Sequence, residues 1–151
     1  MKIVTINDKE NEILRQIMPD FDFSAHDKKE VVGVIREMRQ EMKRAGGVGL
    51  SGNQVGLDWR LFVAEIEDEF YAIFNPKITK TSITVEELEE GCLSLPEIYV
   101  PVDRPIRVTL EGQDQNGKKL KIKAGTPLSR VFQHETDHLN GKLITDHKSQ
   151  A

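Results

Sequence analysis

Apolar residues recur at helical spacing early in the chain, in residues 27–45 (DKKEVVGVIREMRQEMKRA). Charged residues occupy the positions between them, which is typical of a helix that buries one face. Asp27 is placed to cap this helix, with Glu30 three residues later as in a capping box. Gly46 and Gly47 end it. The apolar stripe consists of Val31, Val34, Ile35, Met38 and Met42.

Short runs rich in β-branched and aromatic residues follow a glycine-rich turn and predict strands. Residues 106–111 alternate apolar and polar side chains most clearly. The segment Gln113–Lys119 contains the Asn116-Gly117 pair that is typical of a hairpin turn. The predicted strands are Arg60–Ile66, Phe70–Phe74, Ile78–Val85, Ile106–Glu111 and Leu120–Lys123.

A second helix is predicted from Pro127 to about Gly141, with Thr126 as its N-cap and the proline in its first turn. The sequence contains no internal repeat and no linker, so residues 1–151 are expected to form one domain. The elements predict an α+β fold, in which short antiparallel or mixed β-sheets pack around the late helix. The apolar face of that helix is Leu128, Val131, Phe132 and Leu139.

Composition excludes several classes of protein. The formal net charge of -4 gives no electrostatic footprint for nucleic acid. No apolar run approaches the roughly 20 residues of a membrane span, and the first residues lack the apolar core of a secretory signal. The lone cysteine, Cys92, cannot form an internal disulfide. We therefore expect a cytoplasmic or organelle-matrix protein that binds neither membranes nor nucleic acid.

The late helix carries the sequence QHETDH at residues 133–138. Residues four apart lie on one helix face, so His134 and His138 can direct imidazole nitrogens at one metal ion. Glu135 is placed beside the open position of that metal, where a carboxylate serves as general base. Two surface histidines on a polar helix are the alternative. Apolar residues flank the motif on both sides, so the helix should be partly buried, and a cation is the simplest partner for its polar groups.

A catalytic metal needs a third protein ligand and one open position for water. Cys92 offers a thiolate, a soft donor that favours Fe(II), Zn, Co or Ni over Mg or Ca. Gly91 just before it would let the backbone approach a ligand closely, although a buried apolar thiol is a common fate for a single cysteine. His26 and His147 lie in segments without other site-like features, and we expect both to be solvated.

Three motifs occur in order along the chain: GVGLSGNQ at residues 47–54, EGCLS at residues 90–94, and QHETDH at residues 133–138. Together they resemble the signature motifs of peptide deformylases, and the similarity runs over nearly the whole chain. The resemblance implies a metal-dependent hydrolase that removes the formyl group from the N-terminal methionine of nascent polypeptides. It implies Cys92, His134 and His138 as metal ligands, Fe(II) as the physiological ion, and Zn, Ni or Co as substitutes.

The resemblance also implies the remaining catalytic roles. Water or hydroxide would take the fourth metal position and attack the formyl carbon. Glu135 would accept the proton of that water and pass it to the departing amine. The Gln54 side-chain amide and the Leu93 backbone N–H would donate hydrogen bonds to the developing oxyanion.

The substrate would lie as an extended peptide against the glycines of the first motif, Gly49 among them, and near Gly91. We nominate Val48, Leu88 and Val131 as walls of a pocket for the methionine side chain, although each could equally be plain core. A structural ion pair between Glu90 and Arg104 is expected to support the cysteine loop.

Three features depart from the family pattern. Relatives commonly have Leu-Ala-Ala where this chain has Leu50-Ser51-Gly52, but the residues stay small, so close backbone approach should survive. Tyr99 stands near the place where some bacterial relatives have an arginine thought to contact substrate. The chain ends soon after Asp146, similar to short and bacteriophage-borne members, so we do not expect the ribosome docking that a C-terminal helix supports. We expect a monomer.

Two other functions fit parts of the sequence. A zinc endopeptidase also uses a HExxH helix, but its third ligand would normally be histidine or glutamate. A metal-binding module without activity is the second alternative. It is disfavoured because the five chemical positions are all intact, namely Gln54, Cys92, His134, Glu135 and His138.

Overall fold

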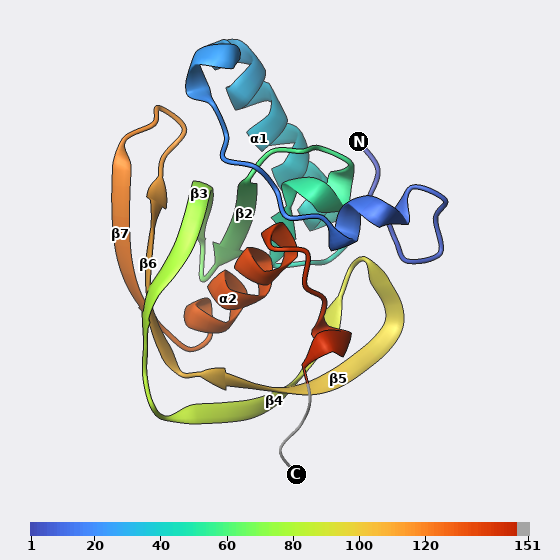
Figure 1. The fold of residues 1–151 in the computed structure, drawn as a ribbon, viewed down its shortest axis with the longest axis vertical. Helices are drawn as coiled ribbons and strands as arrows, with labels where there is room; N and C mark the ends of the chain where they lie inside the picture. Colours follow the sequence, from blue (N-terminus) through green and yellow to red (C-terminus); the bar gives the residue numbers. More distant parts are fainter. Residues whose placement is uncertain (148–151) are drawn as a thin grey trace.

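The computed structural model describes residues 1–147 of the chain. It shows an α+β fold with two α-helices, α1 (Lys28–Arg44) and α2 (Leu128–Leu139), as the sequence predicts (Figure 1). Neither is long and apolar enough to cross a membrane. Short 3-10 helices cover Asn11–Arg15, Phe23–Ala25, Gly52–Val55 and Ile144–Asp146. The strands are β1 (Gly49–Ser51), β2 (Leu61–Ile66), β3 (Glu69–Thr81), β4 (Val85–Cys92), β5 (Leu95–Pro105), β6 (Arg107–Gln113) and β7 (Lys119–Gly125).

The strands form two antiparallel sheets. One has five strands in the order β1-β2-β3-β6-β7, and the other is the β4–β5 hairpin. The predicted turn between β6 and β7 is confirmed. Gly117 has a positive φ of 81°, which glycine adopts without strain. The Asp114 carboxylate accepts hydrogen bonds from the backbone N–H groups of Asn116 and Lys118 at 2.8 and 3.0 Å.

Two strand predictions are wrong. Residues 70–74 and 78–85 were expected as separate strands, yet β3 runs continuously through Asn75 and Pro76. The pair is accommodated by a register shift against β6 and by a positive φ of 51° at Asn75. Strands β1 and β4 were not predicted. Strand β5 was not predicted either, because its sequence LPEIYVPVDRP contains three prolines and reads as a breaker-rich loop. It pairs along its length with β4, outside the larger sheet.

Helix α1 begins and ends as predicted. Asp27 accepts a hydrogen bond from the Glu30 backbone N–H at 2.8 Å, so the N-cap is confirmed. The second half of the expected capping box is replaced by another contact, since the Glu30 carboxylate lies 3.1 Å from the His26 ring. Gly46 has a φ of 75° and directs the chain out of the helix.

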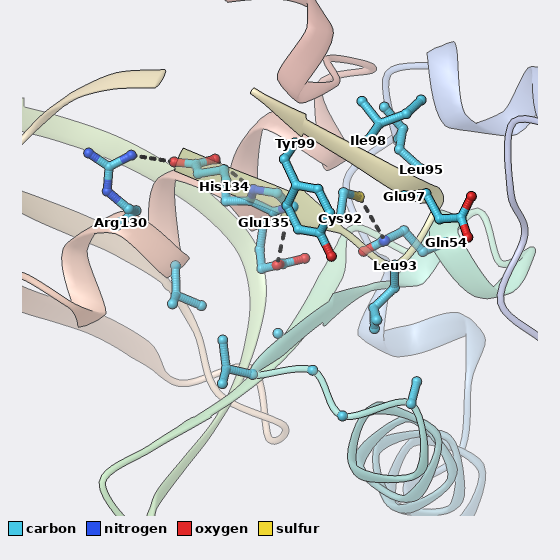
Figure 2. Close-up of a pocket in the computed structure, with 18 residues that line it drawn as sticks. Gln54, Cys92, Leu93, Leu95, Glu97, Ile98, Tyr99, Arg130, His134 and Glu135 are labelled. Carbon is cyan, nitrogen blue, oxygen red and sulfur yellow. Dashed lines mark hydrogen bonds and ion pairs between the residues drawn. The ribbon is translucent and has the colours of Figure 1, made fainter. Parts of the chain in front are cut away.

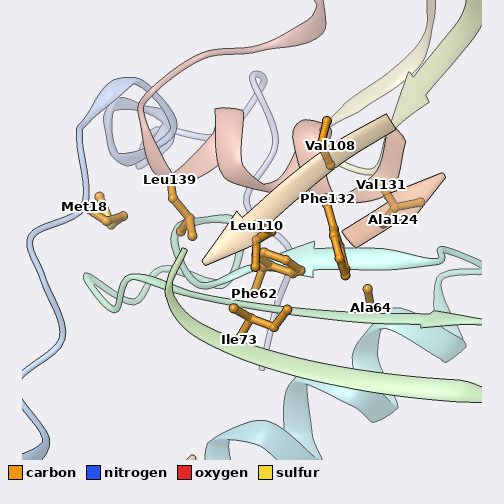
Figure 3. Close-up of a cluster of buried hydrophobic side chains, with 10 residues drawn as sticks. All are labelled: Met18, Phe62, Ala64, Ile73, Val108, Leu110, Ala124, Val131, Phe132 and Leu139. Carbon is orange, nitrogen blue, oxygen red and sulfur yellow. The ribbon is translucent and has the colours of Figure 1, made fainter. Parts of the chain in front are cut away.

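Helix α2 lies centrally, between the five-stranded sheet and the β4–β5 hairpin (Figure 1). Thr126 does not cap it as predicted. Its hydroxyl instead donates to the Ile106 carbonyl at 3.3 Å, and Pro127 is the residue that precedes the helix. The core between α2 and the sheet consists of Met18, Phe62, Ala64, Ile73, Val108, Leu110, Ala124, Val131, Phe132 and Leu139 (Figure 3).

Helix α1 covers part of the opposite face of the same sheet. Its buried residues Val31, Ile35 and Met38 pack with Leu61 and Val63 of β2. The sheet is therefore enclosed between two helices at its β1–β2 end, and α2 is held in the interior. This arrangement places the QHETDH motif next to the glycine-rich segment that leads into β1 and to the cysteine at the end of β4.

Candidate metal centre and cleft

The structure brings the three expected metal ligands together. The Cys92 Sγ atom lies 3.2 Å from His138 Nε2, which lies 3.1 Å from His134 Nε2. All three ligand atoms fall within 4.8 Å of one another. The two imidazoles come from successive turns of α2, and the sulfur comes from the last residue of β4. The spacing along one helix therefore determines the positions of two ligands, and the packing of the β4–β5 hairpin against α2 determines the position of the third.

The second nitrogen of His134 is held by a buried carboxylate. His134 Nδ1 lies 3.0 Å from Glu90 Oε1, which leaves Nε2 to face the centre. Metal-binding histidines typically make such a hydrogen bond, because it fixes the ring and its tautomer. Glu90 also receives two hydrogen bonds from Arg104, at 2.6 and 2.9 Å, and the expected ion pair is therefore confirmed. The ion pair therefore does more than support the cysteine loop, because Glu90 also orients the ring of His134, an expected metal ligand.

Two further residues complete this ion-pair cluster, and the sequence analysis missed both. Arg130 of α2 contacts Glu90 and also donates to the carbonyls of Glu86 and Val102. Asp137, the fifth residue of the QHETDH motif, accepts a hydrogen bond from Arg104 at 3.0 Å. Arg130 lies four residues before His134, on the same helix face. Only that spacing could have indicated its role.

The electrostatics of the two imidazoles fit a bound cation. Burial opposes charge on both rings. Hydrogen bonds with Cys92 and Glu90 nevertheless raise the pKa of His134 to about 10. Burial and the charge of His134 hold the pKa of His138 well below its ordinary value. Two Nε2 atoms that face each other at 3.1 Å can share only one positive charge, and a thiol sulfur stands beside them. A divalent cation bound by a thiolate and two neutral imidazoles satisfies all three donors at once.

Glu135 lies beside the three ligands, in a fully enclosed position. Its side chain is 5% exposed, and Oε1 is buried without a hydrogen-bond partner. Burial raises its pKa to about 7. A Cβ atom on Gly49 would come within 2.6 Å of Glu135 Oε2, so only glycine fits there. The other oxygen, Oε2, lies 4.0 Å from His134 Nε2. A buried carboxyl group with one oxygen free of hydrogen bonds and a near-neutral pKa is suited to accepting and returning a proton.

Gln54 is fixed with its amide nitrogen toward the ligands. Its Oε1 accepts a hydrogen bond from the Ser51 backbone N–H at 3.0 Å, and the Ser51 hydroxyl lies at the same distance. Its Nε2 lies 3.0 Å from Ser94 Oγ and 3.7 Å from Cys92 Sγ. Ser51, one of the departures from the family pattern, is therefore more than a small residue, because its hydroxyl takes part in this network.

A cleft of about 480 Å³ opens onto these groups (Figure 2). Four of the five nominated substrate-contacting residues line it: Val48, Gly49, Gly91 and Val131. Leu88 does not, so its place in the methionine pocket stays a prediction. It lies on β4 four residues before Cys92, about 13 Å away along an extended strand, and is 42% exposed.

The hairpin turn after Cys92 supplies the other wall. Leu93, Leu95, Ile98 and Tyr99 line the cleft, and Figure 2 shows the Tyr99 ring in front of Glu135. A Cβ on Gly91 would meet that ring at 2.8 Å, so the glycine lets the tyrosine lie flat against the backbone. Tyr99 itself is 65% exposed at the mouth of the cleft.

We expected the two remaining histidines to be solvated, but each of them contacts other side chains. His26 stacks on Phe21 with ring centroids 4.8 Å apart and also contacts Trp59. His147 Nε2 lies 2.9 Å from Asp137 Oδ2, at the edge of the cluster behind the metal ligands. The contact with Trp59 joins segments distant in sequence, and none of the three contacts follows a helix or strand periodicity that local patterns could reveal.

Comparison with known proteins agrees with this geometry. The family model described as polypeptide deformylase matches residues 1–151. The peptide deformylase of Treponema pallidum (strain Nichols) is 47% identical over 112 residues, covering 74% of this chain and 69% of the relative. The peptide deformylase of Hydrogenovibrio crunogenus is 45% identical over 119 residues, covering 77% and 70% of the two chains.

Solved structures give the same result over almost the entire chain. The crystal structure of peptide deformylase from Thermotoga maritima matches with a TM-score of 0.89 and 36% identity, covering 98% of this chain and 97% of that one. A probable peptide deformylase from Synechococcus phage S-SSM7 matches with a TM-score of 0.86 and 37% identity, covering 98% and 99%. This chain therefore belongs to the peptide deformylase family.

Proposed function

We propose that this chain hydrolyses the N-formyl group of N-formylmethionyl peptides and releases formate, with the cleft beside Cys92, His134 and His138 as its active site. The observation that carries this proposal is the meeting of three ligand atoms within 4.8 Å, next to a buried carboxyl group. Residues 1–151 act as a single catalytic domain. The proposal takes the chain to act as a cytoplasmic monomer, and residues of one chain are enough to line the cleft.

Cys92, His134 and His138 would hold one divalent metal ion. Fe(II) is the physiological choice implied by family membership, and Zn, Ni or Co also suit a thiolate and two imidazoles. When bound, such an ion lowers the pKa of water from ~15.7 toward neutrality, so that a nucleophile exists at cellular pH. The Glu90 contact with His134 Nδ1 keeps Nε2 free for that ligand role.

Glu135 acts as general base and then as general acid. Its unpartnered Oε1 accepts the proton of the attacking water and returns it to the amine nitrogen as the C–N bond breaks. Burial raises the pKa of Glu135 to about 7, so it can exchange a proton near neutral pH. The carboxyl group is packed against Gly49, so it has no room to turn away from the cleft.

Gln54 and Leu93 stabilise the charge that develops on the formyl oxygen. Ser51 fixes the Gln54 amide oxygen, so the amide nitrogen is the group presented near Cys92. Leu93 follows the cysteine directly, and its backbone N–H is the second donor. Losing one donor of this kind typically costs ~10²–10³ in rate.

The peptide binds along the glycine segment. Strand β1 is an edge strand of its sheet and follows directly on Val48, which lines the cleft. An extended peptide can add to such an edge through main-chain hydrogen bonds. The methionine side chain then lies against apolar cleft residues, with Val48, Val131 and Leu95 as its walls.

The direct test is formate release from formyl-Met-Ala by protein purified without oxygen, with metal analysis of the same sample. We expect turnover with about one metal per chain. Glu135→Gln should retain metal and lose ~10²-fold or more in kcat. Glu10→Gln, on an exposed residue outside the cleft lining, is the matched control and should be unchanged. Cys92→Ser should lose both metal and activity.

A parallel assay on casein separates this proposal from a zinc endopeptidase, which shares the HExxH helix. Casein cleavage without formate release would overturn the proposal. Equal turnover by Glu135→Gln and wild type would remove the general-base role. If the protein bound metal but neither released formate nor cleaved casein, it would be a metal-binding module without catalysis.

A further inference from the structure

One part of the five-stranded sheet has an uncovered outer face. Leu110 of β6 and Ala124 of β7 point toward α2 and are buried in the core beneath it. Side chains alternate along a strand, so Thr109 and Lys123 point the opposite way. Helix α1 covers that outer side over β1 and β2, but its buried residues make no core with β6 or β7. Figure 1 shows β6 and β7 extending beyond α1.

The uncovered surface carries five cations, which we call the basic face: Lys80, Arg107, Lys119, Lys121 and Lys123. All five are exposed. The pairing register aligns them, since Lys80 stands opposite Thr109, and Thr109 stands opposite Lys123. Glu111, opposite Lys121, is the one acid that β6 and β7 direct to this side. A chain with a net charge of -4 thus concentrates positive charge on one surface.

None of these five cations is neutralised within the described residues. No ion pair or side-chain hydrogen bond joins them to another described residue, in contrast to Arg39 and Arg104, which both bind carboxylates. Lys80, Arg107 and Lys123 meet around a hollow of about 410 Å³. Its remaining polar lining includes the hydroxyl-bearing residues Ser82 and Thr109, and no acid lines it. A concave site with three cations, hydroxyl groups and no carboxylate suits phosphate oxygens.

Protection of a sheet edge explains only part of this pattern. Lysines commonly occupy edge strands because they discourage pairing with other chains. Strand β7 is such an edge, so Lys119, Lys121 and Lys123 fit that role. Arg107 lies on β6, which is paired with β3 on one side and β7 on the other. Lys80 lies on β3 beyond Phe74, where the pairing with β2 has ended and only β6 is a partner, so edge protection can account for Lys80 but not for Arg107. Arg107 protects no edge, and it forms the hollow together with Lys80 and Lys123.

We propose that the basic face binds the phosphate backbone of double-stranded RNA. The side chains that β6 and β7 direct outward are charged or polar, and none is aromatic, so bases of a single strand have no ring to stack on. Ile83 and Val85 are the exposed apolar side chains nearby, and two are fewer than the set that anchors a protein in a lipid surface. The regular phosphate backbone of a duplex can be bound by cations alone.

The choice of RNA over other polyanions rests on the proposed function, because formylmethionyl peptides are made where structured RNA is abundant. The proposal also revises the expectation of no nucleic acid, which was drawn from net charge alone. Net charge averages over the surface, whereas binding depends on the local field. Acidic side chains gather instead on β4, where Glu86, Glu87 and Glu89 are exposed.

The test is binding of a fluorescently labelled RNA duplex, followed by anisotropy between ~50 and ~200 mM salt. Wild-type protein should bind and weaken steeply as salt rises. Lys80→Gln/Arg107→Gln should bind about tenfold or more weakly at low salt, and its log–log salt slope should fall by about 1.8 if both cations contact phosphates. Lys9→Gln/Lys142→Gln removes the same charge from exposed sites elsewhere and should bind like wild type.

Formate release and thermal unfolding of every variant show that each one is folded and active. Absence of RNA binding by an active wild-type enzyme would overturn the inference and leave the proposed function intact. Equal losses in the two double variants would overturn it too, because total charge would then decide binding. Binding to vesicles containing anionic lipid, or to duplex DNA, without binding to RNA would reject RNA as the partner.

Discussion

Two ion-pair clusters in this protein use the same chemistry in different surroundings. The buried cluster comprises Glu90, Arg104, Arg130, His134 and Asp137, and the surface cluster comprises Arg39, Lys43 and Glu65. In the buried cluster the Glu90 and Arg104 side chains are 6% and 4% exposed. In the surface cluster Arg39 and Lys43 are 42% and 58% exposed around Glu65. Each cluster centres on one glutamate: Arg104, Arg130 and His134 hold Glu90, and Arg39 and Lys43 hold Glu65.

The difference in burial decides what each cluster can do. Water screens the surface charges, so losing one partner costs little there. A buried charge that loses its partner has no such compensation. Hydrogen bonds to His134 and Arg104 outweigh burial and hold the pKa of Glu90 far below its ordinary range. The buried cluster therefore fixes the orientation of a metal ligand, whereas the surface cluster joins α1 to β2.

The largest effect is expected for Glu90→Gln. The variant leaves Arg104 with Asp137 as its remaining carboxylate partner and weakens the acceptor for His134 Nδ1. Breaking a buried pair costs roughly 3–5 kcal/mol of unfolding free energy, and losing a partner of a metal ligand weakens metal affinity about 10- to 100-fold. Denaturant unfolding and competition with a metal chelator measure the two losses. Unchanged values in both would contradict the role given to Glu90.

A double variant separates stability from ligand positioning. Glu90→Met/Arg104→Met replaces the buried ion pair with apolar side chains of similar length, a change that is often close to neutral for stability. We expect most of the stability lost in Glu90→Gln to return. Metal affinity should stay low, because His134 Nδ1 still lacks its acceptor. Recovery of both quantities would show that Glu90 has no positioning role.

Arg130→Gln should have an intermediate effect. Its guanidinium contacts Glu90 at one end but also donates to the carbonyls of Glu86 and Val102, and its side chain is 13% exposed. Loss of one hydrogen bond to a charged group costs about 1.5–3 kcal/mol. Glu90 keeps Arg104, so metal content should be nearly normal. The same unfolding and chelator assays apply, and a loss of metal equal to that of Glu90→Gln would contradict this ranking.

The smallest effect is expected for Glu65→Gln in the surface cluster. Thermal unfolding should shift by no more than about 2 °C, with formate release unchanged. The hydrogen bond from Arg39 lowers the pKa of Glu65 below its ordinary value of 4.5. Its contribution is therefore present above pH 4.5 and is lost as pH falls through the lowered pKa. The difference from wild type should disappear in acid, and a difference that grows there would have the wrong sign.

The sequence predicted those parts of the molecule that depend on local spacing. His134 and His138 are one helical turn apart, and the caps, apolar stripes and Asn116-Gly117 turn are also local patterns. Cys92 could be assigned only because its motif matches a family, since 42 residues separate it from His134. Strand β5 was missed because its partner is β4, and pairing between strands overrides the weak strand propensity of a proline-rich segment.

Residues that support the site were harder to find than the residues within it. Arg130 has no motif, and its role emerges only where β4 packs against α2. Ser51 looked like a tolerated substitution, and its contact with Gln54 depends on the turn into Gly52–Val55. Leu88 was nominated because it is near the cysteine motif in sequence, and its role in the pocket stays a prediction.

The central claim is that one cation is held by a sulfur from β4 and two imidazoles from α2. Anomalous diffraction from crystals of zinc-loaded protein, recorded at the zinc absorption edge, tests it most directly. We expect one strong peak about 2.3 Å from Cys92 Sγ and about 2.0–2.1 Å from Nε2 of both His134 and His138. A fully loaded crystal with its peak elsewhere, or with no contact to Cys92, would contradict the account.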